Sequence, residues 1–95
     1  MKELLERTKE SLVKAINELP QIREERIIIE SAQVVNHWET GWGVVLSTKD
    51  RRIILNHVSG DVISKKIEAY FGNDVTWEVF AHPLGCFVRP ILPSD

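Results

Sequence analysis

Four side chains in this sequence can bind a metal ion or act as a nucleophile and its base: His37, His57, His82 and the single cysteine, Cys86. Imidazole and thiolate are ligands that suit zinc, and four of them would complete a structural site. The spacing argues against such a site, because only His82 and Cys86 are close in sequence and no paired-ligand motif surrounds them. A thiol enzyme would need Cys86 beside an imidazole base. We assign none of the four as catalytic or metal-binding, and we expect no cofactor.

Two tryptophans are the main candidates for a binding surface. Trp38 and Trp42 flank the segment Glu39 to Gly41, in which Gly41 is available for a positive φ angle at a hairpin loop. Large aromatic side chains at a hairpin tip lie far from the core, and exposed tryptophans dominate interface energies. The alternative for each ring is to fold back and pack on the sheet edge. Trp77 alternates with apolar neighbours and is expected in the core.

The elements that must position these residues follow from the hydrophobic pattern. Apolar residues at helical spacing predict a first helix from Lys2 to Leu19, which Pro20 ends. A second helix is expected to begin at the cap residue Asp61 and to end at Gly72 and Asn73. Strands are predicted over residues 26–38 with a bulge near residue 31, and over 42–47, 51–57, 75–82 and 86–91.

These elements predict one α+β domain over residues 1–95, with a loose tail at 93–95. Two helices pack on one face of a five-stranded mixed sheet, in the order α-β-β-β-α-β-β. A right-handed crossover after the second helix would lay the fourth strand parallel to the third. The three histidines, Cys86 and the hairpin tip would then share one rim, where open sheets with crossovers tend to hold ligands.

Composition and charge restrict the function. The net charge of −2, from 12 basic and 14 acidic residues, provides no field to gather nucleic acid or an anionic membrane. Basic residues at Lys49, Arg51, Arg52 and Lys65–Lys66 have acidic neighbours and read as solvated faces, without the aromatic interleaving of single-strand binders. No apolar run reaches membrane-spanning length, and one cysteine suits a reducing compartment. We expect a soluble, cytoplasmic protein.

One stretch resembles a known family. Residues 53–83 combine a strand, His57, a helix, Gly72, a second strand and the step Phe80-Ala81-His82-Pro83. In this order of elements and in its Phe-His-Pro step, the stretch resembles the excision-controlling XisI proteins of cyanobacterial mobile elements. The segment before His57 is shorter than in that family. We assign no functional residue from the resemblance.

The sequence favours a small non-enzymatic binding or regulatory module that engages another protein. Its expected binding residues are His37, Trp38, Trp42, His57 and His82. Two alternatives remain open: a small metal-dependent or thiol enzyme that uses the histidines and Cys86, and a nucleic-acid-binding accessory protein. A homodimer formed through the last strand, as an exposed edge, is a further possibility.

Overall fold

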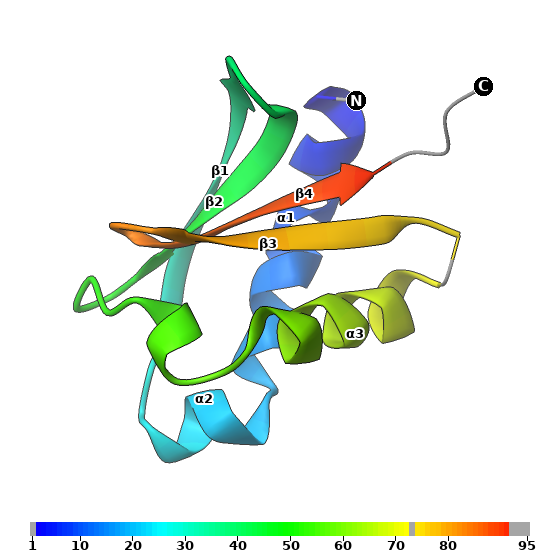
Figure 1. Cartoon of the computed structure of the whole chain (residues 1–95). Helices are drawn as coiled ribbons and strands as arrows, with labels where there is room; N and C mark the ends of the chain where they lie inside the picture. The colour runs from blue at the N-terminus through cyan, green and yellow to red at the C-terminus, as the bar shows by residue number, and fades with distance from the viewer. Residues whose placement is uncertain (1, 73, 92–95) are drawn as a thin grey trace.

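Two main helices cover one face of a four-stranded antiparallel sheet in the computed structural model, which describes residues 2–72 and 74–91 (Figure 1). The main elements follow in the order α-β-β-α-β-β, and the predicted tail at 93–95 lies outside the described residues. The elements are α1 (Lys2–Asn17), α2 (Pro20–Glu24), β1 (Ile29–His37), β2 (Gly41–Thr48), the 3₁₀ turn η1 (Ile54–Asn56), α3 (Gly60–Phe71), β3 (Thr76–His82) and β4 (Gly85–Ile91).

The core lies between the two main helices and the sheet. Full burial of an aliphatic side chain stabilises the folded state by roughly 1.5–3 kcal/mol. The chain has a single cysteine and can form no internal disulfide, so its fold depends on this burial. Trp77 is 7% exposed and belongs to this core, as the alternation of β3 predicts. The fully buried aliphatic residues include Leu5, Leu12, Ile16, Val44, Leu46, Ile63, Ile67 and Val88.

The first helix ends earlier than predicted and is followed by a second, short one. α1 stops at Asn17, whose side chain turns to the backbone of Ile29: Oδ1 accepts from the amide at 3.0 Å and Nδ2 donates to the carbonyl at 3.4 Å. Pro20 then begins α2, because a first helical residue needs no amide hydrogen. No described helix is both long enough and apolar enough to cross a membrane.

The predicted third strand, residues 51–57, is wrong. Its apolar run forms the turn η1, in which Ile54 is fully buried, and Val58 is buried four residues later at helical spacing. This segment therefore contributes Ile54 and Val58, one turn apart, to the core, and not the alternate residues that a strand would contribute. The cap of α3 also differs from the prediction, since Ser59 Oγ accepts from the Val62 amide and Asp61 lies in the first turn. The predicted end at Gly72 is confirmed, with φ 100°, and Asn73, which shared that prediction, lies outside the described residues.

The predicted parallel pairing is wrong as well, because every pair in the sheet is antiparallel and the strand order is β1-β2-β4-β3. β4 lies between β2 and β3, so the last strand is not the edge that the homodimer hypothesis required. Gly85 permits this close pairing: a Cβ at that position would overlap the carbonyl oxygen of Leu46 on β2.

The β1–β2 hairpin leaves the sheet before its tip. β2 pairs with β4 only from Val44↔Val88 to Ser47↔Gly85, whereas β1 and β2 stay paired out to His37↔Gly41. Beyond Val88, β4 pairs only with β3, which explains how an interior strand accommodates Pro90. Figure 1 shows the hairpin rising away from β3 and β4. The predicted irregularity near residue 31 and the positive φ of Gly41, 83°, are confirmed.

Candidate binding site on the open face of the sheet

The sheet face opposite the helices carries an apolar cluster of its own. Val45 pairs with Phe87 on β4, and Phe87 pairs with Phe80 on β3, so their side chains form one row across the sheet. Val45 and Phe87 are only 7% and 6% exposed, although neither belongs to the core between helices and sheet. Phe80 stays partly exposed, with its ring 6.2 Å from that of Phe87. This face therefore has a buried apolar centre that no helix among residues 2–72 and 74–91 covers.

Gly43 makes room for the aromatic ring at the centre of the cluster. A Cβ on Gly43 would overlap the outer atoms of the Phe87 ring, so the ring lies directly over the backbone of β2. The same Cβ would also lie 2.8 Å from the backbone carbonyl oxygen of Val88, so a larger residue would have to displace both the ring and the strand. A glycine within a strand is unfavourable for the strand alone, and here the close approach of a ring explains it.

The hairpin tip is held against this face by Arg89. Its Nη1 donates to the carbonyl of Thr40 at 2.9 Å, and its Nη2 donates to Oε1 of Glu78, its cross-strand neighbour, at 2.6 Å. A recess of about 400 Å³ lies between the hairpin and the β3–β4 turn. Val35, Val45, Phe80 and Phe87 give it an apolar lining, to which the hairpin adds His37, Glu39 and Thr40 and β3 adds His82.

The two histidines of the recess are held in the same tautomer. Nδ1 of His37 accepts from the amide of Glu39, and Nδ1 of His82 accepts from the amide of Leu84, both at 3.1 Å. An Nδ1 that accepts from an amide carries no hydrogen of its own, so in these bonds the ring hydrogen is on Nε2. Neither Nε2 has a hydrogen-bond partner within residues 2–72 and 74–91. Both histidines line the recess, and each ring has one N–H donor that no described residue uses.

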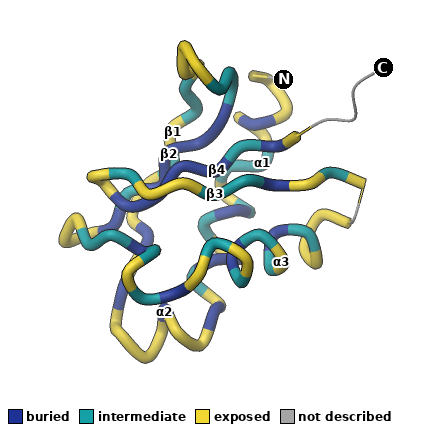
Figure 2. Tube along the Cα trace, viewed as in Figure 1, coloured by how far each residue is buried: buried dark blue, intermediate teal, exposed yellow. Residues whose placement is uncertain are grey.

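The two tryptophans have different environments. Trp38 is 86% exposed at the hairpin tip, and the ring of His37 stacks on it with centroids 5.9 Å apart. Figure 2 shows the tip as one of the exposed parts of the chain. Trp42 is on the opposite face of β2, where it packs against the core, and Nζ of Lys2 lies 5.9 Å from its ring centre. Only Trp38 is exposed to the extent that a binding anchor requires.

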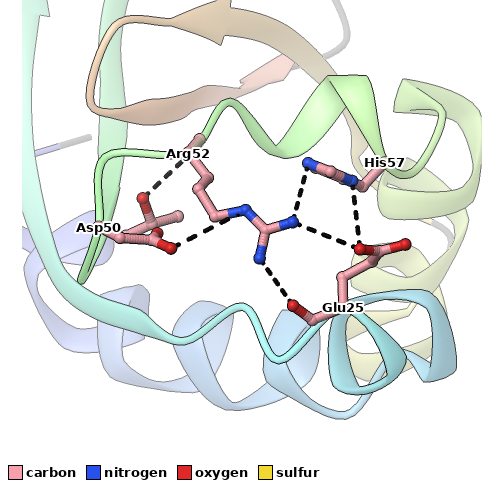
Figure 3. Close-up of polar contacts among 5 residues, drawn as sticks. Glu25, Asp50, Arg52 and His57 are labelled. Carbon is pink, nitrogen blue, oxygen red and sulfur yellow. Dashed lines mark hydrogen bonds and ion pairs between the residues drawn. The ribbon is translucent and has the colours of Figure 1, made fainter.

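His57 lies outside the recess, in a polar cluster between α2 and η1 (Figure 3). Arg52 donates from Nη1 to the carbonyl of Glu25 at 2.7 Å, and its Nη2 lies 3.4 Å from Oε2 of Glu25 and 3.3 Å from Nε2 of His57. Asp50 approaches Nε of Arg52 at 3.9 Å. The cluster ties the end of α2 to the segment that replaces the predicted third strand, which is a structural role for His57.

Cys86 is on the helix side of the sheet, fully buried, and does not face the recess. Burial raises the pKa of its thiol to about 12, so the reactive thiolate is absent at neutral pH. The expected convergence of four residues therefore holds for His37 and His82 and fails for His57 and Cys86. Among the residues described, no three His, Cys, Asp or Glu side chains are arranged to hold a metal ion.

Sequence reasoning missed Phe80, Phe87 and Arg89. Their signal is the alternation of β3 and β4, which puts Phe80 on the face opposite Trp77, and Phe87 with Arg89 on the face opposite Cys86. Comparison with protein-family models, curated proteins and solved structures finds no match. The resemblance of residues 53–83 to the excision-controlling proteins also loses its first shared element, because residues 53–57 form no strand.

Proposed function

We propose that this chain is a non-enzymatic module that binds another protein through the open face of its sheet. In this proposal Trp38 is the anchor, and the recess receives an apolar side chain of the partner. The observation that carries it is an indole 86% exposed and stacked on His37, which lines an apolar recess on the sheet face that none of the described helices covers. Tryptophan is enriched among the residues that supply most of the energy of protein interfaces.

The charges of this face support a protein partner. Charged residues make up 27% of the chain, yet the described part of the recess lining has a single charged side chain, Glu39. Arg89 and Glu78 beside it are bound to each other. The centres of protein interfaces are depleted of charged residues and enriched in aromatic residues and arginine.

The two alternative functions find less support in this arrangement. An enzyme that uses the histidines and Cys86 together has no shared site, because Cys86 and His57 lie outside the recess. Aromatic residues on an open four-stranded sheet can stack nucleotide bases. Phosphate contacts would supply most of that affinity, but Glu39 is in the lining and Arg89 is already paired.

A peptide-display selection tests the proposal. A random library is panned on the wild-type protein alone, and the selected peptides are then measured against the wild-type protein, Trp38→Ala, Phe80→Ala and a control, Lys65→Ala on α3. We expect binding to weaken at least about tenfold in both Trp38→Ala and Phe80→Ala, which is the loss of affinity expected when an anchor residue of an interface is truncated. Binding to Lys65→Ala should be unchanged. Peptides that bind all four proteins equally well would contradict the proposal.

A further inference from the structure

The chemistry of the recess restricts its occupant beyond the need for an apolar group. Val35, Val45, Phe80 and Phe87 offer only carbon atoms from their side chains, and a recess of about 400 Å³ is large enough for one aromatic or branched side chain. Burial of such a group releases water from an apolar surface that is already formed. This part of the site selects size and hydrophobicity.

The polar atoms of the recess select hydrogen-bond acceptors. His37 and His82 each use Nδ1 to accept from a backbone amide, which leaves Nε2–H as the free donor of each ring. The Thr40 carbonyl at the tip already accepts from Arg89. An occupant that brings acceptor oxygens satisfies both rings without disturbing their backbone bonds.

The charges of the recess select against an anion. No lysine or arginine is among the residues that line it, and Glu39 adds a carboxylate to its wall. A bound carboxylate or phosphate would lose solvation without gaining a cation, and Glu39 would repel it. A neutral acceptor such as an amide carbonyl carries no such cost.

We propose that the recess binds an uncharged peptide segment, with an apolar side chain on its lining and the adjoining backbone carbonyls accepting from Nε2–H of His37 and His82. This inference rests on the proposed function and specifies the partner for the same site. It distinguishes an internal segment of a partner chain, with amide carbonyls at both sides, from a free C-terminus, which carries a carboxylate.

A pair of matched probes tests the inference. N-acetyl-phenylalaninamide and N-acetyl-phenylalanine differ only in the amide or carboxylate at the end, and each is titrated at neutral pH while amide resonances of the ¹⁵N-labelled protein are followed. We expect saturable shifts at Val35, Val45, Phe80 and Phe87. The amide should bind at least about threefold more tightly than the carboxylate, because the charge of Glu39 repels the carboxylate.

Three variants assign this preference to the named groups. Glu39→Gln should reduce the difference between the two probes, and Glu24→Gln, on the exposed side of α2, should leave it unchanged. The double variant His37→Ala/His82→Ala should weaken the amide probe about tenfold, from the loss of two hydrogen bonds. Unshifted resonances in the helices confirm that each variant is folded.

Tighter or equal binding of the carboxylate, or no shift of the recess resonances up to the solubility limit, would overturn the inference. These results do not decide the proposed function. Displayed peptides that require Trp38 but leave the resonances of Val45 and Phe87 unshifted would retain the binding module and reject this account of its recess.

Discussion

Arg89 on β4 donates to the backbone carbonyl of Thr40 at the tip of the β1–β2 hairpin, a contact of 2.9 Å between residues 49 apart in sequence. Backbone pairing between β2 and β4 has ended at Val44↔Val88, so this hydrogen bond joins the projecting tip to the sheet, together with the rings of His37 and Phe87, whose centroids are 6.1 Å apart. Arg89 is positioned in turn by Glu78, at 2.6 Å. The shape of the recess depends on this link between two hairpins.

Arg89→Leu should therefore loosen the hairpin tip. We expect faster amide exchange at residues 38–42 and a loss of stability of about 1–2 kcal/mol, the usual cost of removing a charged hydrogen-bond donor. Glu78→Gln is the control, because it removes the ion pair and leaves the bond to Thr40. Hydrogen exchange followed by NMR checks both variants, and equal protection of the tip in Arg89→Leu would refute the role of this contact.

Gly43→Ala should destabilise the open face through Phe87. The added Cβ overlaps the ring, and overpacking of this kind costs roughly 1–3 kcal/mol. Phe87→Leu removes the ring atoms that would overlap, so the double variant should lose less stability than the sum of the single variants. Urea denaturation of the four proteins measures this coupling. Additive losses would show that the ring and the glycine do not interact.

Cys86 should be unreactive in the folded protein and should make stability fall at alkaline pH. Burial raises the pKa of its thiol from 9.0 to about 12, so above pH 9 the unfolded chain loses a proton that the folded chain keeps. The protonated thiol makes its full contribution to the free energy of unfolding below pH 9. This contribution is lost between pH 9 and pH 12, at up to about 1.4 kcal/mol per pH unit. Cys86→Ala should lack this loss when both proteins are unfolded in urea at pH 8 and pH 10. Alkylation of the native thiol as fast as that of the unfolded thiol would contradict its burial.

Arg52→Met should destabilise the fold and leave the recess unchanged. The substitution removes the bond to the carbonyl of Glu25 and the contact with His57, which is expected to cost about 1–2 kcal/mol. The shifts that N-acetyl-phenylalaninamide produces at Val45 and Phe87 should match those of the wild-type protein. A changed probe affinity with unchanged stability would instead make the cluster of Figure 3 part of the binding site.

Substitution of each tryptophan by alanine should distinguish the binding role of Trp38 from the packing role of Trp42. Trp38→Ala is expected to change stability by no more than about 0.5 kcal/mol, because its side chain is almost fully exposed. Trp42→Ala should cost about 2 kcal/mol or more, since its ring packs against the core. Denaturation curves measure the stabilities, and acrylamide should quench the fluorescence of Trp38 more strongly than that of Trp42. The reverse order would exchange their assigned roles.

Local signals in the chain identified the elements that depend on neighbouring residues. The helical spacing of α1, the glycine end of α3, the positive φ of Gly41 and the core side of Trp77 were all predicted correctly. The run Ile53-Ile54-Leu55 was misread because consecutive apolar residues suit a buried strand and a helical turn equally well. The separation of Ile54 from Val58, two buried residues four positions apart, was the available signal.

By itself, the sequence determined that this is an α+β chain with helices on one sheet face and an aromatic hairpin tip, because periodicity and turn chemistry act over a few residues. Only the tertiary structure decided which strands are neighbours. The insertion of β4 between β2 and β3 joins Val45, Phe87 and Phe80 into one row and brings Arg89 to Thr40. Strand order depends on how the whole core is filled, and no local pattern encodes it.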